Sequence, residues 1–109
     1  MSSDPGFVEY ICDQLQDAAE ISSRKMFGEW AIYSGPKVVA LVCDDRLFVR
    51  PTAAGRAFIG EPVEAPPYPG AKLHFLIEDR IDERGWLTGL IRVTEHEIPV
   101  PKPKKRKAD

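Results

Sequence analysis

Residues 21–50 of this chain read ISSRKMFGEWAIYSGPKVVALVCDDRLFVR. Short apolar segments alternate here with residues that favour turns, a pattern typical of consecutive β-strands. Gly28 allows a bend, residues 34–37 supply turn chemistry, and Asp44-Asp45 makes a tight polar turn. We therefore expect strands over residues 21–27, 29–33, 37–43 and 46–50. The connections are too short for parallel crossovers, so the sequence predicts an antiparallel meander.

A helix is expected upstream of the meander. Asp4 is a suitable N-cap and Pro5 suits the first helical position. Apolar residues then recur at helical spacing, on the face formed by Phe7, Val8, Ile11, Leu15 and Ala18. This pattern predicts an amphipathic helix that packs on the strands.

Two further helices and one further strand are expected downstream. Thr52 can cap a short helix over residues 53–59, with Gly60 as its stop. Residues 61–70 hold four prolines and predict a stiff surface loop, followed by a strand over residues 72–78. Asp82 can cap a last helix that ends before His96, with an apolar face formed by Trp86, Leu87, Leu90 and Ile91.

The predicted fold class is therefore α+β, in two layers. An antiparallel sheet of about five strands would carry the N-terminal, the short middle and the C-terminal helices on one face. We assign residues 1–98 to one domain and residues 99–109 to a disordered basic tail.

The 37–43 segment is apolar on both faces, which a two-layer domain does not by itself explain. Strict alternation places Val39, Leu41 and Cys43 on one face, and Val38, Ala40 and Val42 on the other. Either a loop covers the second face, or that face is buried against another subunit. Each fully buried Val or Leu is worth about 1.5–3 kcal/mol, so we expect a homodimer that uses Val39, Leu41 and Cys43.

Composition and charge narrow the functional classes. The net charge of −2 combines a body of −6 with a tail that carries five basic residues and one acid. The body would repel a polyanion, so any contact with nucleic acid must use the tail or a local patch. The sequence has no secretory signal and no span long enough to cross a membrane, and its two cysteines are too few for a disulfide framework. We expect a cytoplasmic protein with free thiols.

No residue pattern predicts catalysis, a cofactor or a metal site. Cys12 and Cys43 have no recognisable spacing to His74 or His96, and buried thiols are ordinarily inert. In the strand expected over residues 72–78, His74 lies on the same side as Lys72 and opposite Leu73 and Phe75, so we expect it to face solvent. Zinc-ligand spacings and Gly-rich phosphate loops are both missing from the sequence. We therefore expect a protein that is not an enzyme.

The basic tail has three interpretations. It resembles a nuclear localisation signal in composition, it could be a flexible arm for nucleic acid or an acidic partner, or it could simply be a solubilising terminus. A contact with nucleic acid would be weak, salt-sensitive and non-specific, because no aromatic residue is interleaved to stack on bases. The residues concerned are Lys102, Lys104, Lys105, Arg106 and Lys107.

The stretch Arg24-Lys25-Met26-Phe27-Gly28 also has two interpretations. Met26 and Phe27 could pack in the core while Gly28 permits a bend, or Arg24 and Lys25 could meet an anion or an acidic partner. With the preceding helix and the meander that follows, this motif resembles the TfoX N-terminal domain family. The resemblance continues through Trp30-Ala31-Ile32-Tyr33 and residues 40–49, and more weakly through Arg56-Ala57-Phe58 and Pro67-Tyr68.

The resemblance implies a bacterial, dimer-prone α+β domain similar to secretion-chaperone folds. It also implies a link to regulators or coactivators of competence-gene transcription, which carry a second, helical domain where this chain carries its basic tail. Our first hypothesis is an accessory protein associated with transcription through protein contacts. The alternative is a dimeric interaction module or chaperone-like adaptor with no role on nucleic acid.

Overall fold

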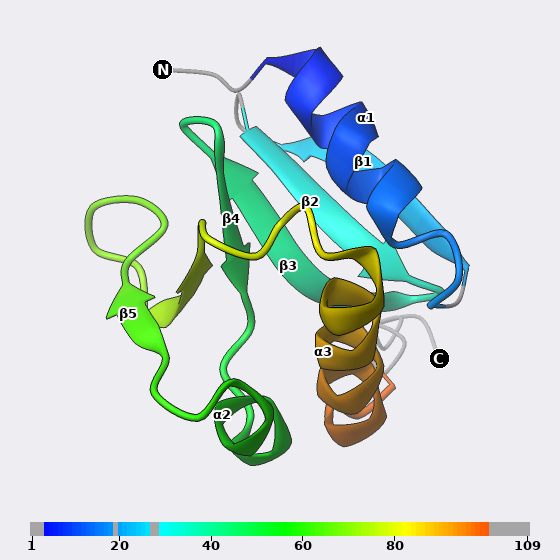
Figure 1. Ribbon diagram of the computed structural model, residues 1–109. Helices are drawn as coiled ribbons and strands as arrows, with labels where there is room; N and C mark the ends of the chain where they lie inside the picture. The colour runs from blue at the N-terminus through cyan, green and yellow to red at the C-terminus, as the bar shows by residue number, and fades with distance from the viewer. Residues whose placement is uncertain (1–3, 19, 27–28, 101–109) are drawn as a thin grey trace, which may run out of the picture.

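The computed structural model describes residues 4–18, 20–26 and 29–100. Within them the chain forms helices and strands in an α-β-β-β-β-α-β-β-α order (Figure 1). In chain order these are α1 (Pro5–Gln14), β1 (Ile21–Met26), β2 (Glu29–Ser34), β3 (Lys37–Cys43), β4 (Arg46–Val49), α2 (Ala53–Ile59), β5 (Val63–Ala65), β6 (His74–Ile77) and α3 (Arg84–Glu97).

The strands form one antiparallel sheet in the order β1-β2-β3-β4-β6-β5. The first four strands are neighbours in sequence and in space, which confirms the predicted meander. The chain then leaves the sheet through α2 and returns on its far side, so that β1 and β5 are the two edge strands. The fold is α+β, as predicted, and the described sheet has six strands where we expected about five.

The helices lie against one face of the sheet, in front of it in Figure 1, with α2 below its lower end. The core lies between the layers. It is formed by residues of α1 and α3 together with one set of strand side chains, the largest fully buried members being Ile11, Leu15, Ile32, Leu47, Phe75, Leu87, Leu90 and Ile91. We call the sheet face toward these residues the covered face, and the opposite one the outer face.

Two of the three predicted helix caps are confirmed. The Asp4 side chain accepts a hydrogen bond from the Gly6 amide at 3.1 Å, and Thr52 Oγ1 accepts one from the Gly55 amide at 2.9 Å. Helix α2 has the predicted bounds, and Gly60 ends it with φ of 97°.

The start and end of α3 differ from our expectation. Asp82 does not cap this helix: Glu83 occupies the N-cap position without a side-chain hydrogen bond, and the Asp82 carboxylate instead accepts a hydrogen bond from the Tyr10 hydroxyl of α1. Asp82 therefore joins α1 to the loop before α3. The helix also includes His96 in its last turn, where we expected it to have ended.

Strand β5 was not predicted, because prolines flank it on both sides and it is only three residues long. It pairs with β6 through Val63 opposite Leu76 and Ala65 opposite His74. The prolines at 62, 66 and 67 shorten the strand without preventing it, since an edge strand tolerates proline where a central strand does not.

A bulge in β3 corrects the prediction for Val39. Ile32 pairs with Ala40, but the next residue, Tyr33, pairs with Val38, so Val39 is an extra residue in the ladder. Val39 is 0% exposed and belongs to the same core cluster as Ala40 and Val42. The bulge breaks the strict alternation that we assumed, and it removes Val39 from the outer face.

Candidate functional site

The outer face of the sheet is apolar, although none of the three described helices covers it. The register places Ala31 beside Leu41, Leu41 beside Phe48, and Phe48 beside Leu76, so these side chains form one row across four strands. Cys43 follows Leu41 on the same face by alternation along β3. This row is the structural feature that the two-layer fold leaves unexplained.

An apolar groove lies beside Leu41 of this row, where β1 ends and β2 begins. Its volume is about 510 Å³, within the range in which proteins bind ligands or partner side chains. It is lined, among the described residues, by Met26, Glu29, Trp30, Leu41, Cys43 and Tyr68. Two of the three residues predicted for a dimer face and one residue of the family motif therefore meet in one hollow.

The proline-rich loop after β5 forms the far wall of the groove. Strand β5 is the opposite edge of the sheet, yet Tyr68 lines the groove with Leu41 and Cys43 of the central strand β3. The loop must therefore lie over the outer face between these strands. Pro67 is buried and Phe48 is 3% exposed, while Tyr68 itself is 56% exposed. The loop covers part of the face, as one of our two explanations proposed, and leaves the groove beside it open.

A tight turn shapes the end of the groove. Asp44 and Asp45 have φ of 54° and 58°, the left-handed conformation of a two-residue hairpin turn, which aspartate tolerates better than most residues. The Asp44 amide donates a hydrogen bond to Glu29 Oε2 at 3.2 Å, which ties the β3–β4 turn to the start of β2. Glu29 is the one acid among the described lining residues.

The two thiols are held in their neutral form. Burial, assisted by the nearby carboxylates of Glu29 and Asp44, raises the pKa of the Cys43 thiol to about 11. Burial also raises the pKa of Cys12, against an opposing hydrogen bond with Ser23. Because the thiolate is the nucleophilic form, neither side chain is activated for catalysis at neutral pH.

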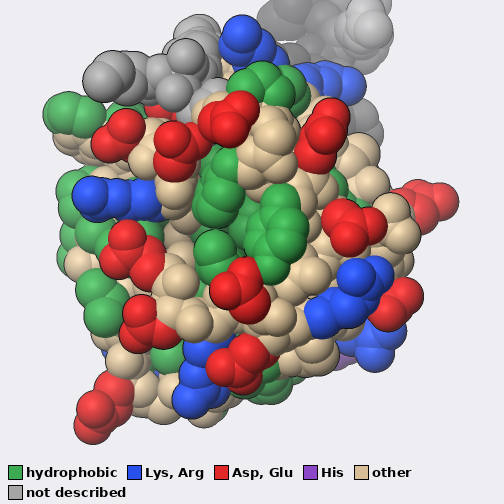
Figure 2. All heavy atoms as spheres, turned by 45° about the horizontal axis from the view of Figure 1, so that its top comes forward, with side chains coloured by type: hydrophobic (Ala, Val, Ile, Leu, Met, Phe, Trp, Pro, Cys, Tyr) green, Lys and Arg blue, Asp and Glu red, His purple; other side chains and the backbone are tan. Residues whose placement is uncertain are grey.

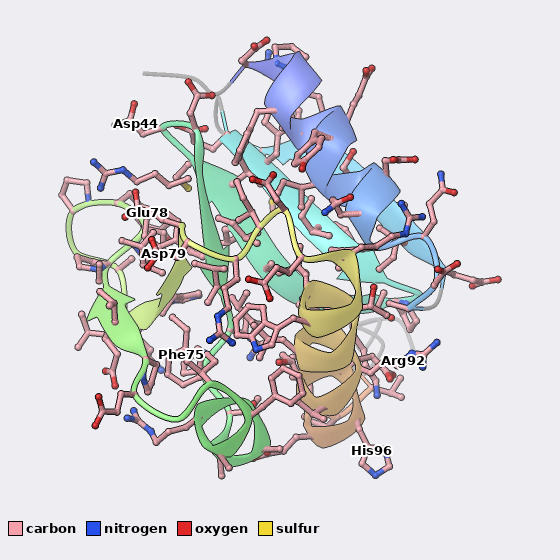
Figure 3. All side chains as sticks on the ribbon, in the orientation of Figure 1. Asp44, Phe75, Glu78, Asp79, Arg92 and His96 are labelled. Carbon is pink, nitrogen blue, oxygen red and sulfur yellow. The ribbon has the colours of Figure 1, made fainter. Side chains whose placement is uncertain are left out.

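Neither histidine lies where it could activate Cys43. His74 Nδ1 lies 2.9 Å from the Lys72 carbonyl oxygen, and the residue is half-buried, where we expected it to face solvent. His96 projects from the lower end of α3, whereas Asp44, the neighbour of Cys43, lies at the opposite end of the molecule (Figure 3). Across the described ranges no group of three or more His, Cys, Asp or Glu side chains is arranged to hold a metal ion.

A second hollow, of about 220 Å³, lies between β6 and the start of α3. Acidic side chains surround it, including Glu78 and Asp79, which lie close together in Figure 3. Arg46 lies 3.8 Å from Glu78. Arg80 also lines the hollow, with its guanidinium 5.0 Å from the Trp86 ring centroid. More generally, acidic side chains are spread across the face shown in Figure 2, with exposed hydrophobic side chains between them.

The remaining predicted residues fall into two groups. Arg24, Lys25 and Met26 are the last three residues of β1, with the two basic side chains exposed and Met26 half-buried. Phe27 and Gly28 lie outside the described residues, and so do Lys102, Lys104, Lys105, Arg106 and Lys107 of the tail.

Tyr68, Trp30 and Glu29 line the groove but were not predicted from the sequence to do so. Glu29 and Trp30 are the first two residues of β2, and their convergence with Tyr68 depends on the path of a loop that periodicity does not predict. One signal was present, since Pro67-Tyr68 belongs to the weaker part of the resemblance described above.

Comparison with known proteins identifies the family. The model of the TfoX N-terminal domain matches residues 13–96, which is most of the chain and includes all six strands of the sheet. The chain belongs to the TfoX N-terminal domain family. This TfoX N-terminal domain is also 38% identical over 107 residues to a protein of Spirochaeta aurantia described as an uncharacterized 12.7 kDa protein in the trpE 5′ region, and the match covers 98% of this chain and 93% of that protein.

The helices of this TfoX N-terminal domain are short. In the part of the chain that the structure describes, none combines the length and the apolar character needed to cross a bilayer.

Proposed function

We propose that this TfoX N-terminal domain is a non-catalytic accessory protein that acts through protein contacts, as a homodimer whose outer sheet faces meet. The observation that carries the proposal is the groove beside Tyr68. An apolar hollow on a sheet face that none of the described helices covers is typical of an interaction surface.

The shape of the outer face favours a second copy of the chain as the occupant. Tyr68 is more than half exposed and stands directly beside the hollow that it helps to line. A two-fold axis brings the same patch of both subunits together, so a protruding ring next to a hollow is self-complementary. In such a dimer each Tyr68 would enter the groove of the other subunit and cover its Leu41.

The neutral thiols of Cys12 and Cys43 support a role without catalysis. The raised pKa of Cys43 leaves its thiol protonated at neutral pH, so the residue contributes apolar surface to the groove. A regulatory role in transcription is supported by family membership alone, and we propose it as the cellular setting of these protein contacts.

The dimer is tested by placing a charge in the groove. Leu41→Glu should weaken self-association at least about 30-fold, because a carboxylate would be buried in an apolar interface without a partner. Leu73→Glu, at a half-exposed position outside the groove lining, is the matched control and should leave association unchanged. Sedimentation equilibrium from 1 to 200 μM measures both. Equal association of the two variants would contradict the proposal.

The contribution of the tail is tested separately. An electrophoretic mobility shift should compare the full chain with a chain that ends at Pro99, at 50 and 200 mM salt. We expect weak binding of duplex DNA by the full chain at low salt only, since five basic residues neutralise few phosphates. Binding by the shortened chain would show that the body contacts DNA and would contradict a role through protein contacts alone.

A further inference from the structure

Strand β1 is a long and regular edge of the sheet. It pairs with β2 through six consecutive residues without a register shift, and none of the strands that the structure describes lies on its other side. Four of its residues, Ser22 to Lys25, are exposed. Figure 1 shows β1 as the outermost strand on the side of α1, behind that helix.

The backbone groups on the free side of β1 can be assigned from the ladder. The Gly35 amide donates to the Glu20 carbonyl at 2.8 Å, and hydrogen-bonded pairs alternate along an antiparallel ladder. Ser22, Arg24 and Met26 are therefore directed toward β2. The amides and carbonyls of Ile21, Ser23 and Lys25 point away from the sheet, and within the described residues no backbone hydrogen bond is formed on that side.

The opposite edge of the sheet is closed to further pairing. Strand β5 has only three residues, and the prolines at 62, 66 and 67 stand on either side of it. Short length and flanking proline are the usual means by which proteins protect an edge strand. Strand β1 has twice the length, contains no proline and has no bulge. The two edges therefore differ in their capacity to accept another strand.

The charges on β1 indicate which strand it would accept. The described chain is acidic, yet Arg24 and Lys25 stand together here, and neither forms an ion pair among the described residues. The Arg24 guanidinium lies 5.7 Å from the Tyr33 ring centroid, which holds it on the outer side of the strand. Lys25, the next residue, points to the other side.

We propose that β1 is a docking strand for an extended, acidic segment of a partner protein, which adds to the sheet beside it. The segment would pair with Ile21, Ser23 and Lys25 through its backbone, and its carboxylates would meet Arg24 on one side and Lys25 on the other. A second copy of this chain fits less well, since pairing β1 with itself would bring two arginines and two lysines into one narrow interface.

This surface is separate from the groove, so the two proposals can fail independently. Met26 is the only described residue that belongs to both, at the end of β1. Leu41→Glu is expected to disrupt dimers and to leave docking at β1 intact. Charge reversal at Lys25, whose side chain points away from the outer face, is expected to weaken docking and to leave dimers intact.

The test uses an end-capped peptide in which pairs of valines alternate with pairs of glutamates, so that carboxylates lie on both sides of the extended chain. It is added to the full chain and followed by amide hydrogen exchange in NMR spectra. In the free chain the amides of Ile21, Ser23 and Lys25 should exchange quickly, and those of Ser22, Arg24 and Met26 slowly. Saturating peptide should slow the first set at least tenfold. That protection of every second residue is the signature of an added strand and would not arise from a contact through side chains alone.

Variants then test the charge requirement. Arg24→Glu combined with Lys25→Glu should weaken peptide binding about tenfold, while Lys72→Glu, at an exposed lysine outside β1, should change it less than twofold. A matching peptide of valine and lysine should not bind. Circular dichroism checks that the variants remain folded.

Three results would overturn the proposal. These are peptide binding without protection of Ile21, Ser23 and Lys25, protection centred on the groove strands, and protection of β1 that rises with the concentration of the chain alone. The last would identify a second copy as the occupant of the edge.

Discussion

The covered face and the outer face of the sheet carry similar apolar side chains, yet different layers lie above them. On the covered face Val42, Leu47 and Phe75 are sealed by α1 and α3 and are at most 1% exposed. On the outer face the loop after β5 reaches the row through Tyr68, and Leu41 stays half-buried there although Phe48 is 3% exposed. The hydrophobic side chains of a strand therefore do not by themselves show whether its face is part of the core or a binding surface. The element that packs on that face decides it.

Two neighbouring residues of β6 test whether the two faces of the sheet are packed differently. Phe75 and Leu76 are neighbours in β6 and point to opposite faces. Phe75→Ala should lower the free energy of unfolding by about 3–5 kcal/mol, because it leaves a cavity in a packed core. Leu76→Ala should cost about 1–2 kcal/mol, since Leu76 is only partly buried. Urea unfolding at low protein concentration measures both, and equal losses would show that the faces are equally packed.

The thiol of Cys43 tests how dry the outer face is. Its pKa is raised from 9.0 to about 11, so folding favours the neutral thiol. The stabilisation that comes from this raised pKa is constant below pH 9. It is lost as the pH rises from 9 to 11, because the Cys43 thiol ionises at a lower pH in the unfolded chain than in the folded one. The loss amounts to about 2–3 kcal/mol between pH 8 and pH 11.

Other groups titrate in the same range, so this loss is measured as a difference. Unfolding of the unsubstituted chain and of Cys43→Ala should be compared at pH 8 and at pH 11. The chain with Cys43 is expected to lose more stability over that interval. An identical pH dependence would mean that water reaches the thiol and that the outer face is wet at this point.

The smallest effects are expected at two glycines of α3, and they test how tightly the helices pack on one another. A Cβ added at Gly85 meets no atom within 4 Å, so Gly85→Ala should raise stability by about 0.5–1 kcal/mol through helix propensity. A Cβ at Gly89 would lie 2.9 Å from Phe58 Cζ of α2. Gly89→Ala should therefore lower stability by about 1 kcal/mol, as thermal unfolding would show. A gain at both positions would mean that α2 packs loosely on α3.

Local chemistry made much of the fold predictable from the sequence. The bounds of β3 and α2 were predicted to the residue, because a β-branched run between turn signals and a Thr cap followed by a Gly stop act over a few residues. Glycine inside a helix ordinarily weakens it, and α3 contains two glycines. The structure gives Gly89 a reason of its own, since a larger residue would collide with Phe58.

The features that the sequence did not predict depend on tertiary pairing. At the bulge, β3 has one residue more than β2, namely Val39. The alternation of apolar residues in the sequence does not show where such an extra residue falls. Strand β5 exists only because β6 lies beside it. Tyr68 reaches Leu41 across the sheet through a loop whose path is not encoded in periodicity. The core was therefore more predictable than the candidate site.

The sequence also did not predict which strands lie at the edges of the sheet. The sequence placed Arg24 and Lys25 on a strand, but it could not show that this strand has one unpaired side. The order of strands in the sheet, set by the return of the chain through β5 and β6, decides which strands are central and which can accept a partner.

We propose that this domain binds another copy of itself through the outer face and not through the helical side. It is tested most directly by solvent paramagnetic relaxation in NMR, using a soluble gadolinium agent at 10 and 500 μM protein. We predict that the relaxation enhancement falls at the higher concentration for Met26, Leu41 and Tyr68, and is unchanged for Tyr10 and Phe58 on the helical side. Protection of the helical side, or equal enhancement at both concentrations, would contradict the account.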